Sequence, residues 1–131
     1  MQPEIPLRSL SDAERLDWLR LIRTETIGPV GFRRLLGRYH TAGRVLDVLP
    51  ELSRRAGRAV LRAFPLAEAA AELQRADDCG ARAIALCEPD YPPLLAAIED
   101  APPLIYVLGE ASALARPAIA VVGSRNASAN G

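Results

Sequence analysis

Gly123, Ser124 and Arg125 have the types and spacing needed to bind an anion, and they directly follow an apolar run at residues 118–122. Glycine allows a ligand to approach the backbone closely, serine offers a hydroxyl and an amide, and an arginine guanidinium can donate two parallel hydrogen bonds to a phosphate. In open α/β sheets, ligands bind beyond the carboxyl ends of the strands. The signal is weak, because this turn matches neither of the standard glycine-rich phosphate loops. The alternative is a tight turn with a solvated arginine.

A second candidate for phosphate contact lies at residues 27–31, between two predicted helices. It has the helix-hairpin-helix pattern of an apolar residue, Gly28, any residue, an apolar residue and Gly31. In such a turn, the backbone amides at the start of the second helix approach a DNA phosphate. We expect a weaker DNA contact here, with Arg33 and Arg34 beside the glycines. The proline between the glycines removes one amide donor, so the alternative is a helical hairpin that only packs.

Residue sets that support catalysis or metal binding are missing from the sequence. His40 is the single histidine, and Cys79 and Cys87 lack the spacing of a zinc site. The acidic pairs at residues 77–78 and 99–100 are adjacent in sequence, so their members point in different directions. We therefore predict no enzyme, no metal and no cofactor, and we expect both thiols to be small buried side chains.

Charge is distributed unevenly along the chain although the formal net charge is zero. All 16 basic residues are arginines, and residues 31–62 hold eight of them against two acids, a net charge of +6. This segment is a candidate phosphate-facing surface, and the alternative is a solvated helical face. No apolar run approaches the roughly 20 residues of a membrane span, and the first residues lack the features of a signal peptide. We expect a cytoplasmic protein with no membrane contact.

The elements that must position these residues change character near residue 80. Apolar residues recur at helical spacing before it, whereas short apolar runs without alternation follow it, which is typical of strands buried in a parallel sheet. We predict an α/β fold, with a helical domain at residues 1–80 and an incomplete parallel sheet at residues 81–131. The predicted helices are 12–25, 32–39, 43–49, 56–64, 66–79 and 91–98, and the predicted strands are 83–87, 104–108 and 118–122.

The second half contains a series of motifs that together point to a known family. It runs Asp90-Tyr-Pro-Pro-Leu-Leu95, then Ala101-Pro-Pro-Leu-Ile-Tyr-Val107, then Arg116-Pro117, then Ala118-Ile-Ala-Val-Val-Gly-Ser-Arg125, with Ala127-Ser128 and Gly131 beyond. The order and spacing of these motifs resemble the DNA-processing protein A family, also called Smf. The first half, with its hairpin, resembles that family's sterile-alpha-motif-like domain.

The resemblance implies binding of single-stranded DNA and loading of the recombinase RecA onto it during natural transformation. It also implies an extended Rossmann-like fold, a homodimer and no catalysis, with Gly123, Ser124 and Arg125 lining the DNA pocket. Asn130 departs from the family, which often has an aromatic residue there. The remaining strands, a later glycine-rich loop, a pocket lysine and the dimer surface would all follow residue 131. We therefore expect this chain to be the first part of a longer protein, which alone would not bind DNA as the whole does.

Two other functions remain open at this point. Related Rossmann-like folds include enzymes that act on nucleotides, such as phosphoribohydrolases, and a fold does not fix a function. The helical half could instead be a docking module for another protein, with its basic face as the contact surface.

Overall fold

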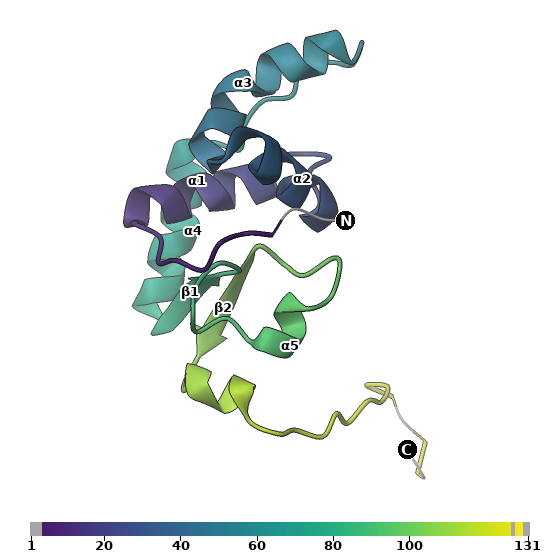
Figure 1. Cartoon of the computed structure of the whole chain (residues 1–131). Helices are drawn as coiled ribbons and strands as arrows, with labels where there is room; N and C mark the ends of the chain where they lie inside the picture. Colours follow the sequence, from purple (N-terminus) through teal and green to yellow (C-terminus); the bar gives the residue numbers. More distant parts are fainter. Residues whose placement is uncertain (1–3, 127, 130–131) are drawn as a thin grey trace.

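The computed structural model describes residues 4–126 and 128–129, and it places helices before strands as expected (Figure 1). This order confirms the α/β class with a helical first part. The elements are α1 (Asp12–Arg23), α2 (Pro29–Tyr39), α3 (Ala42–Arg55), α4 (Leu66–Asp78), β1 (Ala81–Ala85), α5 (Pro93–Ala96), β2 (Leu104–Leu108) and the 3-10 helix η1 (Ala111–Ala115).

Helix α1 begins with a capping box and forms the centre of the helical part. The Ser11 hydroxyl accepts a hydrogen bond from the Glu14 amide at 3.2 Å, and the Glu14 carboxylate accepts one from the Ser11 amide at 2.9 Å. These two bonds satisfy amides that have no partner inside a helix. The buried face of α1 carries Trp18, whose ring meets Phe32 of α2 edge to face with 5.0 Å between the ring centres.

Helix α3 runs through Pro50, where the sequence predicted a break between two shorter helices. An interior proline costs about 3 kcal/mol, because it removes a hydrogen bond and crowds the preceding turn. Val45, Leu46 and Leu49 are buried on the same helix, and each such side chain contributes roughly 1.5–3 kcal/mol. Beyond the proline, Ser53 is buried and its hydroxyl donates to the Leu49 carbonyl at 2.9 Å, which holds the last turn of the helix.

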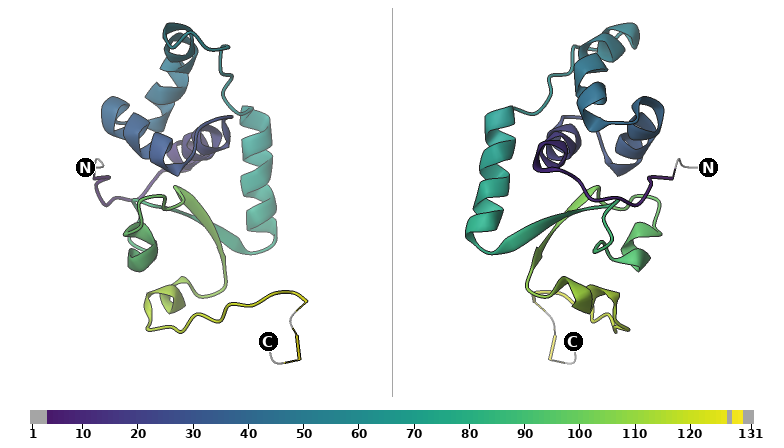
Figure 2. Two further views of the ribbon diagram at one scale, coloured as in Figure 1. Left: turned by 90° about the vertical axis from the view of Figure 1, so that its right-hand side faces the viewer. Right: turned by 60° about the vertical axis from the view of Figure 1, so that its left-hand side comes forward.

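One apolar core joins the helices to the strands. It includes Trp18 and Phe32 from the helical half, and Ile84, Ala85 and Val107 from the strands. Figure 2 shows α4 running beside α1 and leading directly into β1, so that the strand pair lies beneath the helices. The strands are thus held by the helical part as well as by each other.

Strands β1 and β2 pair antiparallel, which corrects the prediction of a parallel sheet. The register runs from Ala81 opposite Leu108 to Ala85 opposite Leu104. A parallel pair needs a long crossover, usually a helix, to bring the chain back along the strand. Here the connection does not cross back, because the Leu86 amide at its start donates to the Pro103 carbonyl at its end, at 2.9 Å. The connection therefore starts and ends at the same end of the pair.

The strand predicted at residues 118–122 does not form. Ile119, Val121 and Val122 are 93%, 95% and 93% exposed. An apolar run becomes a strand only where neighbours cover it, and no described part of the chain covers this one. Ala127, Asn130 and Gly131 of the recognised motif series lie outside the described residues.

Candidate nucleic-acid interface

Five arginines of the basic segment 31–62 are exposed and lack an ion-pair partner within the described ranges. We call this set the arginine surface; its members are Arg34, Arg38, Arg44, Arg58 and Arg62. Two further arginines, at positions 54 and 55, both pair with Glu51 at 3.2 and 2.9 Å. The arginine surface lies on α2, on α3 and on the segment after α3; Figure 1 shows α3 at the end of the molecule away from the strands and α2 beside α1.

The amphipathic pattern of α2 positions the first two members of this surface. Phe32 and Leu36 are buried against the core. Arg34 and Arg38 follow two residues after them and share one helix face, because positions four apart lie above one another. The Arg38 guanidinium lies 5.5 Å from the centre of the Tyr39 ring, a cation–π geometry that leaves its charge available to solvent.

Segment 56–65 carries Arg58 and Arg62. The helix predicted at residues 56–64 does not form. Gly57 has a φ of 64°, a left-handed conformation that ends α3 and that glycine adopts without strain. The Ser53 hydroxyl then donates to the Leu49 carbonyl at 2.9 Å and accepts from the Leu61 amide at 3.1 Å. These bonds hold the chain that carries Arg58 and Arg62.

The end of this segment is fixed to α1. The Thr24 hydroxyl accepts a hydrogen bond from the Phe64 amide at 3.1 Å, and Arg20 donates to the Phe64 carbonyl at 3.0 Å. Thr24 is 3% exposed, so its hydroxyl is committed to this contact. The segment is therefore tied at both ends, which keeps its arginines at one place on the surface.

Of the two glycines of the hairpin pattern, Gly28 precedes α2, whereas Gly31 lies inside the helix, which begins at Pro29 and not at Phe32. Gly28 is the N-cap of α2 and carries no side chain to satisfy the first amides of the helix. A Cβ added at Gly28 or Gly31 would meet no atom within 4 Å, so the space in front of both glycines is open. Arg34 lies exposed one turn further along.

Arg33 has a different environment from its neighbour. Its side chain is half-buried, and one guanidinium nitrogen donates to the Ala96 carbonyl of α5 at 3.2 Å. This contact links α2 to the connection between the strands. Arg33 thus uses one of its hydrogen-bond donors to hold α2 against α5, whereas Arg34 faces solvent.

Gly123, Ser124 and Arg125 lie in an exposed segment near the end of the described chain. The Ser124 hydroxyl accepts a hydrogen bond from the Asn126 amide at 3.2 Å, which forms a local turn. Figure 1 shows this segment at the opposite end of the molecule from α2 and α3. The structure therefore does not bring the two predicted phosphate sites together.

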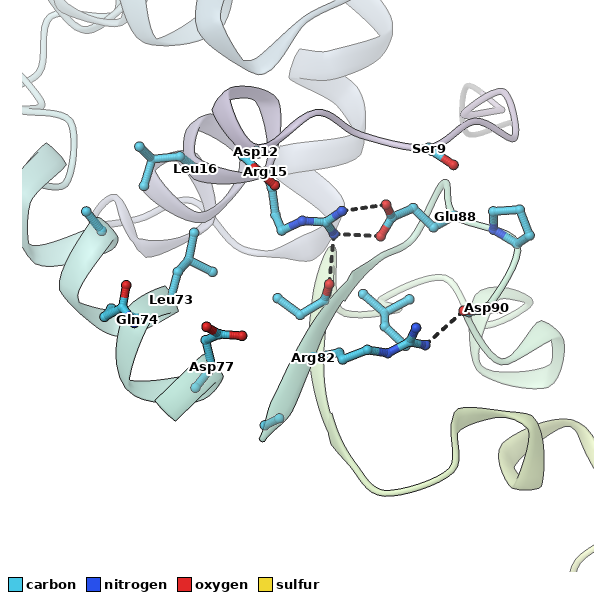
Figure 3. Close-up of a pocket in the computed structure, with 16 residues that line it drawn as sticks. Ser9, Asp12, Arg15, Leu16, Leu73, Gln74, Asp77, Arg82, Glu88 and Asp90 are labelled. Atoms are coloured by element: carbon cyan, nitrogen blue, oxygen red, sulfur yellow. Dashed lines mark hydrogen bonds and ion pairs between the residues drawn. The ribbon is translucent and has the colours of Figure 1, made fainter. Parts of the chain in front are cut away.

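The main groove of the structure lies elsewhere, between α1, α4 and β1 (Figure 3). It has a volume of about 750 Å³. At its edge, Arg15 forms two hydrogen bonds with the Glu88 carboxylate, at 2.6 and 2.7 Å, and a third with the Ala83 carbonyl at 2.8 Å. Glu88 also accepts from the amides of Leu10 and Ala85.

These contacts make Glu88 a fully ionised, half-buried carboxylate at neutral pH. Burial alone would raise its pKa, but the hydrogen bonds from Arg15 and from the two backbone amides lower the pKa to about 2. Sequence reasoning missed this pair, because its partners stand 73 positions apart and no local pattern connects them. The pair fixes β1 against α1, and its carboxylate is unsuited to contact a phosphate.

The motif residues around the strand connection have structural roles. Tyr91 is buried, and its hydroxyl donates to the Pro102 carbonyl at 2.7 Å. Burial raises the pKa of this phenol to about 12. Cys87 is buried as expected, whereas Cys79 is exposed at the end of α4, which corrects the expectation that both thiols are buried.

Within the described part of the chain, no group of three or more metal-binding side chains is gathered in one place. The helices described here are too short or too polar to cross a bilayer.

Comparison with known proteins gives two matches that together span most of the chain. A family model described as the DprA-like N-terminal HHH domain matches residues 12–75, which hold α1 to α3 and most of α4. A second, described as DNA recombination-mediator protein A, matches residues 82–131. No curated protein matched the sequence. Because both models describe one family and follow each other in the order of its parts, the chain belongs to the family of the DNA recombination-mediator protein A.

Proposed function

We propose that this chain binds DNA through the arginine surface, as part of a recombination mediator that binds single-stranded DNA and loads RecA onto it. The observation that carries this proposal is that five arginines on α2, α3 and segment 56–65 are exposed and have no carboxylate partner among the described residues. Unpaired guanidinium groups attract phosphates, and they release condensed counterions when they bind.

The chemistry of this surface favours contact with the sugar-phosphate backbone over contact with bases. Proteins that grip single strands by their bases use exposed aromatic rings as stacking platforms. Trp18, Phe32 and Tyr91 are buried, and Phe64 and Tyr39 are half-buried. Tyr106 is 38% exposed, but it lies on β2 outside the arginine surface, and its hydroxyl donates to Glu72. We therefore expect affinity that depends steeply on salt and weakly on base sequence.

We further propose that Gly123, Ser124 and Arg125 form a second phosphate contact, with Gly28, Gly31, Arg33 and Arg34 contributing a weaker one. In support, Arg125 is exposed, and the space before the two glycines of the hairpin is open. The proposal also includes a cytoplasmic, non-catalytic protein that acts as a homodimer, with a helical domain at residues 1–80 and an incomplete Rossmann-like domain at residues 81–131.

The test is the binding of a fluorescent poly(dT) oligonucleotide across a salt series, for the wild type and for the double variant Arg58→Gln/Arg62→Gln. Each phosphate contact to a single strand contributes about 0.7 to the slope of log affinity against log salt. Losing two contacts should lower that slope by about 1.4 and weaken binding at low salt.

The matched control is Arg75→Gln, an exposed arginine on α4 outside the arginine surface. It should leave both affinity and slope unchanged. If the double variant kept the wild-type slope, or if the control lost as much as the double variant, the arginine surface would not be the DNA contact. A separate Arg125→Gln variant tests the second contact.

A further inference from the structure

The groove between α1, α4 and β1 has an apolar floor that is partly exposed. Leu16 of α1, Leu73 and Ala76 of α4, and Ala83 of β1 all line it and are half-buried. Side chains of this kind gain stability when a partner removes them from water. The groove can therefore receive an apolar side chain from outside.

The rim of the groove is acidic. Two of its four carboxylates are satisfied by arginines, in the pairs Arg15–Glu88 and Arg82–Asp90. Asp12 and Asp77 are exposed and have no ion-pair partner within the described ranges. Figure 3 shows them on different walls, Asp12 on α1 and Asp77 on α4.

The position of Asp77 makes its negative charge unfavourable unless a cation is nearby. It lies beside Asp78 in the last turn of α4, where the helix dipole places partial negative charge and disfavours carboxylates. Gln74 donates a hydrogen bond to Asp78 at 2.8 Å, but the Asp77 carboxylate has no such donor among the described residues. A cation supplied from outside would offset both the dipole and the neighbouring charge.

The walls of the groove are held in place before any partner arrives. Arg15–Glu88 joins α1 to the end of β1, and Arg23 pairs with Glu72 at 2.8 Å to join α1 to α4. Tyr106 of β2 donates to the same Glu72 carboxylate at 2.8 Å. A preformed groove loses little conformational entropy on binding.

We propose that this groove binds a basic, amphipathic segment of a partner protein, with an apolar side chain on the floor and arginine or lysine side chains at Asp12 and Asp77. Charge complementarity selects this occupant, because the unpaired rim is negative and would repel a nucleic acid. The separation of Asp12 and Asp77 on two walls favours an extended or helical segment over a single small ion. The site is distinct from the arginine surface, so one chain would hold DNA and a protein partner on different faces.

The test uses a short capped peptide of arginine, alanine and leucine, with arginine at every fourth position, titrated into isotopically labelled protein. We expect saturable binding, with amide shifts concentrated at Leu16, Leu73, Asp77 and Ala83. The variant Asp12→Asn/Asp77→Asn should weaken binding about five- to tenfold; tenfold corresponds to 1.4 kcal/mol, or about 0.7 kcal/mol for each of two exposed ion pairs.

The matched control is Asp47→Asn/Glu68→Gln, which removes two exposed carboxylates outside the groove and should change little. A peptide with glutamate in place of arginine should not bind. The proposal would be overturned if the peptide did not bind saturably, or if the amide shifts lay away from the groove. It would also be overturned if the two double variants lost equal peptide affinity. Poly(dT) binding should be unchanged in Asp12→Asn/Asp77→Asn, which separates this result from the fate of the proposed DNA function.

Discussion

Replacing Glu88 with glutamine should destabilise the protein by about 3 kcal/mol at neutral pH. The contacts of Glu88 lower its pKa from the ordinary 4.5 to about 2, and each pKa unit corresponds to about 1.4 kcal/mol of stability. The side chains of Arg15 and Glu88 are only 19% and 12% exposed, so solvent screens the pair weakly. Breaking a buried pair on one side costs a similar 3–5 kcal/mol.

The pH dependence gives this prediction its sign. A carboxylate with a lowered pKa in the folded state adds its full stability above its unfolded pKa, and loses that stability as the pH falls. The gap in unfolding free energy between the wild type and Glu88→Gln should therefore be largest above about pH 5. It should shrink towards zero near pH 2. Urea unfolding can be followed by the fluorescence of Trp18, the single tryptophan, which is 2% exposed.

The control is Asp90→Asn, which breaks the Arg82–Asp90 pair on the neighbouring strand connection. Both side chains of that pair are well exposed, at 59% and 61%, so the loss should stay below about 1 kcal/mol at every pH. A gap for Glu88→Gln that stays constant from pH 7 to pH 3 would refute the reasoning. The reasoning would also be refuted if Glu88→Gln lost no more stability than the control Asp90→Asn.

Two smaller predictions concern the thiols and the anchored segment. Cys79 is exposed, whereas Cys87 is buried, and burial raises the pKa of its thiol to about 11. Alkylation at pH 8, followed by mass spectrometry, should therefore modify Cys79 first. Equal rates of alkylation at the two thiols would contradict the burial of Cys87. Thr24→Val leaves the Phe64 amide without its acceptor and should cost about 1–3 kcal/mol, with faster hydrogen exchange at Phe64. Unchanged exchange there would show that the hydroxyl does not hold segment 56–65.

Local signals in the sequence predicted much of the fold. The start of the first helix at Asp12 and the strand at residues 104–108 agree with the sequence-based prediction, because both depend on neighbouring residues. Gly80 ends α4 with a φ of 77°, as its place after a helical run predicts. The arginine-rich segment was also visible from composition alone.

Features that depend on distant residues were not predicted. The continuation of α3 through Pro50 rests on the burial of its apolar face, which tertiary packing decides. The antiparallel pairing of β1 and β2 rests on the contact between the two ends of their connection, Leu86 and Pro103. The run at residues 118–122 has the composition of a strand, but composition does not reveal whether a neighbouring strand is present to cover it.

In the candidate site too, some features follow from local sequence and others depend on distant residues. Only the structure shows that five arginines of the basic segment meet no carboxylate among the described residues, because sequence spacing does not reveal which charges meet. Arg33 and Arg34 are adjacent and chemically alike, yet one donates to the Ala96 carbonyl and the other is exposed. Their difference follows from which side of α2 faces α5.

The Arg15–Glu88 pair also has a consequence during protein synthesis. Its two residues are 73 positions apart, and ribosomes add about 5–20 residues per second. Arg15 therefore leaves the ribosome roughly 4–15 seconds before the carboxylate that neutralises it. During that interval α1 must either remain loosely packed or keep the guanidinium in water, so we expect the helices to reach their final packing only after β1 and the start of its connection have emerged.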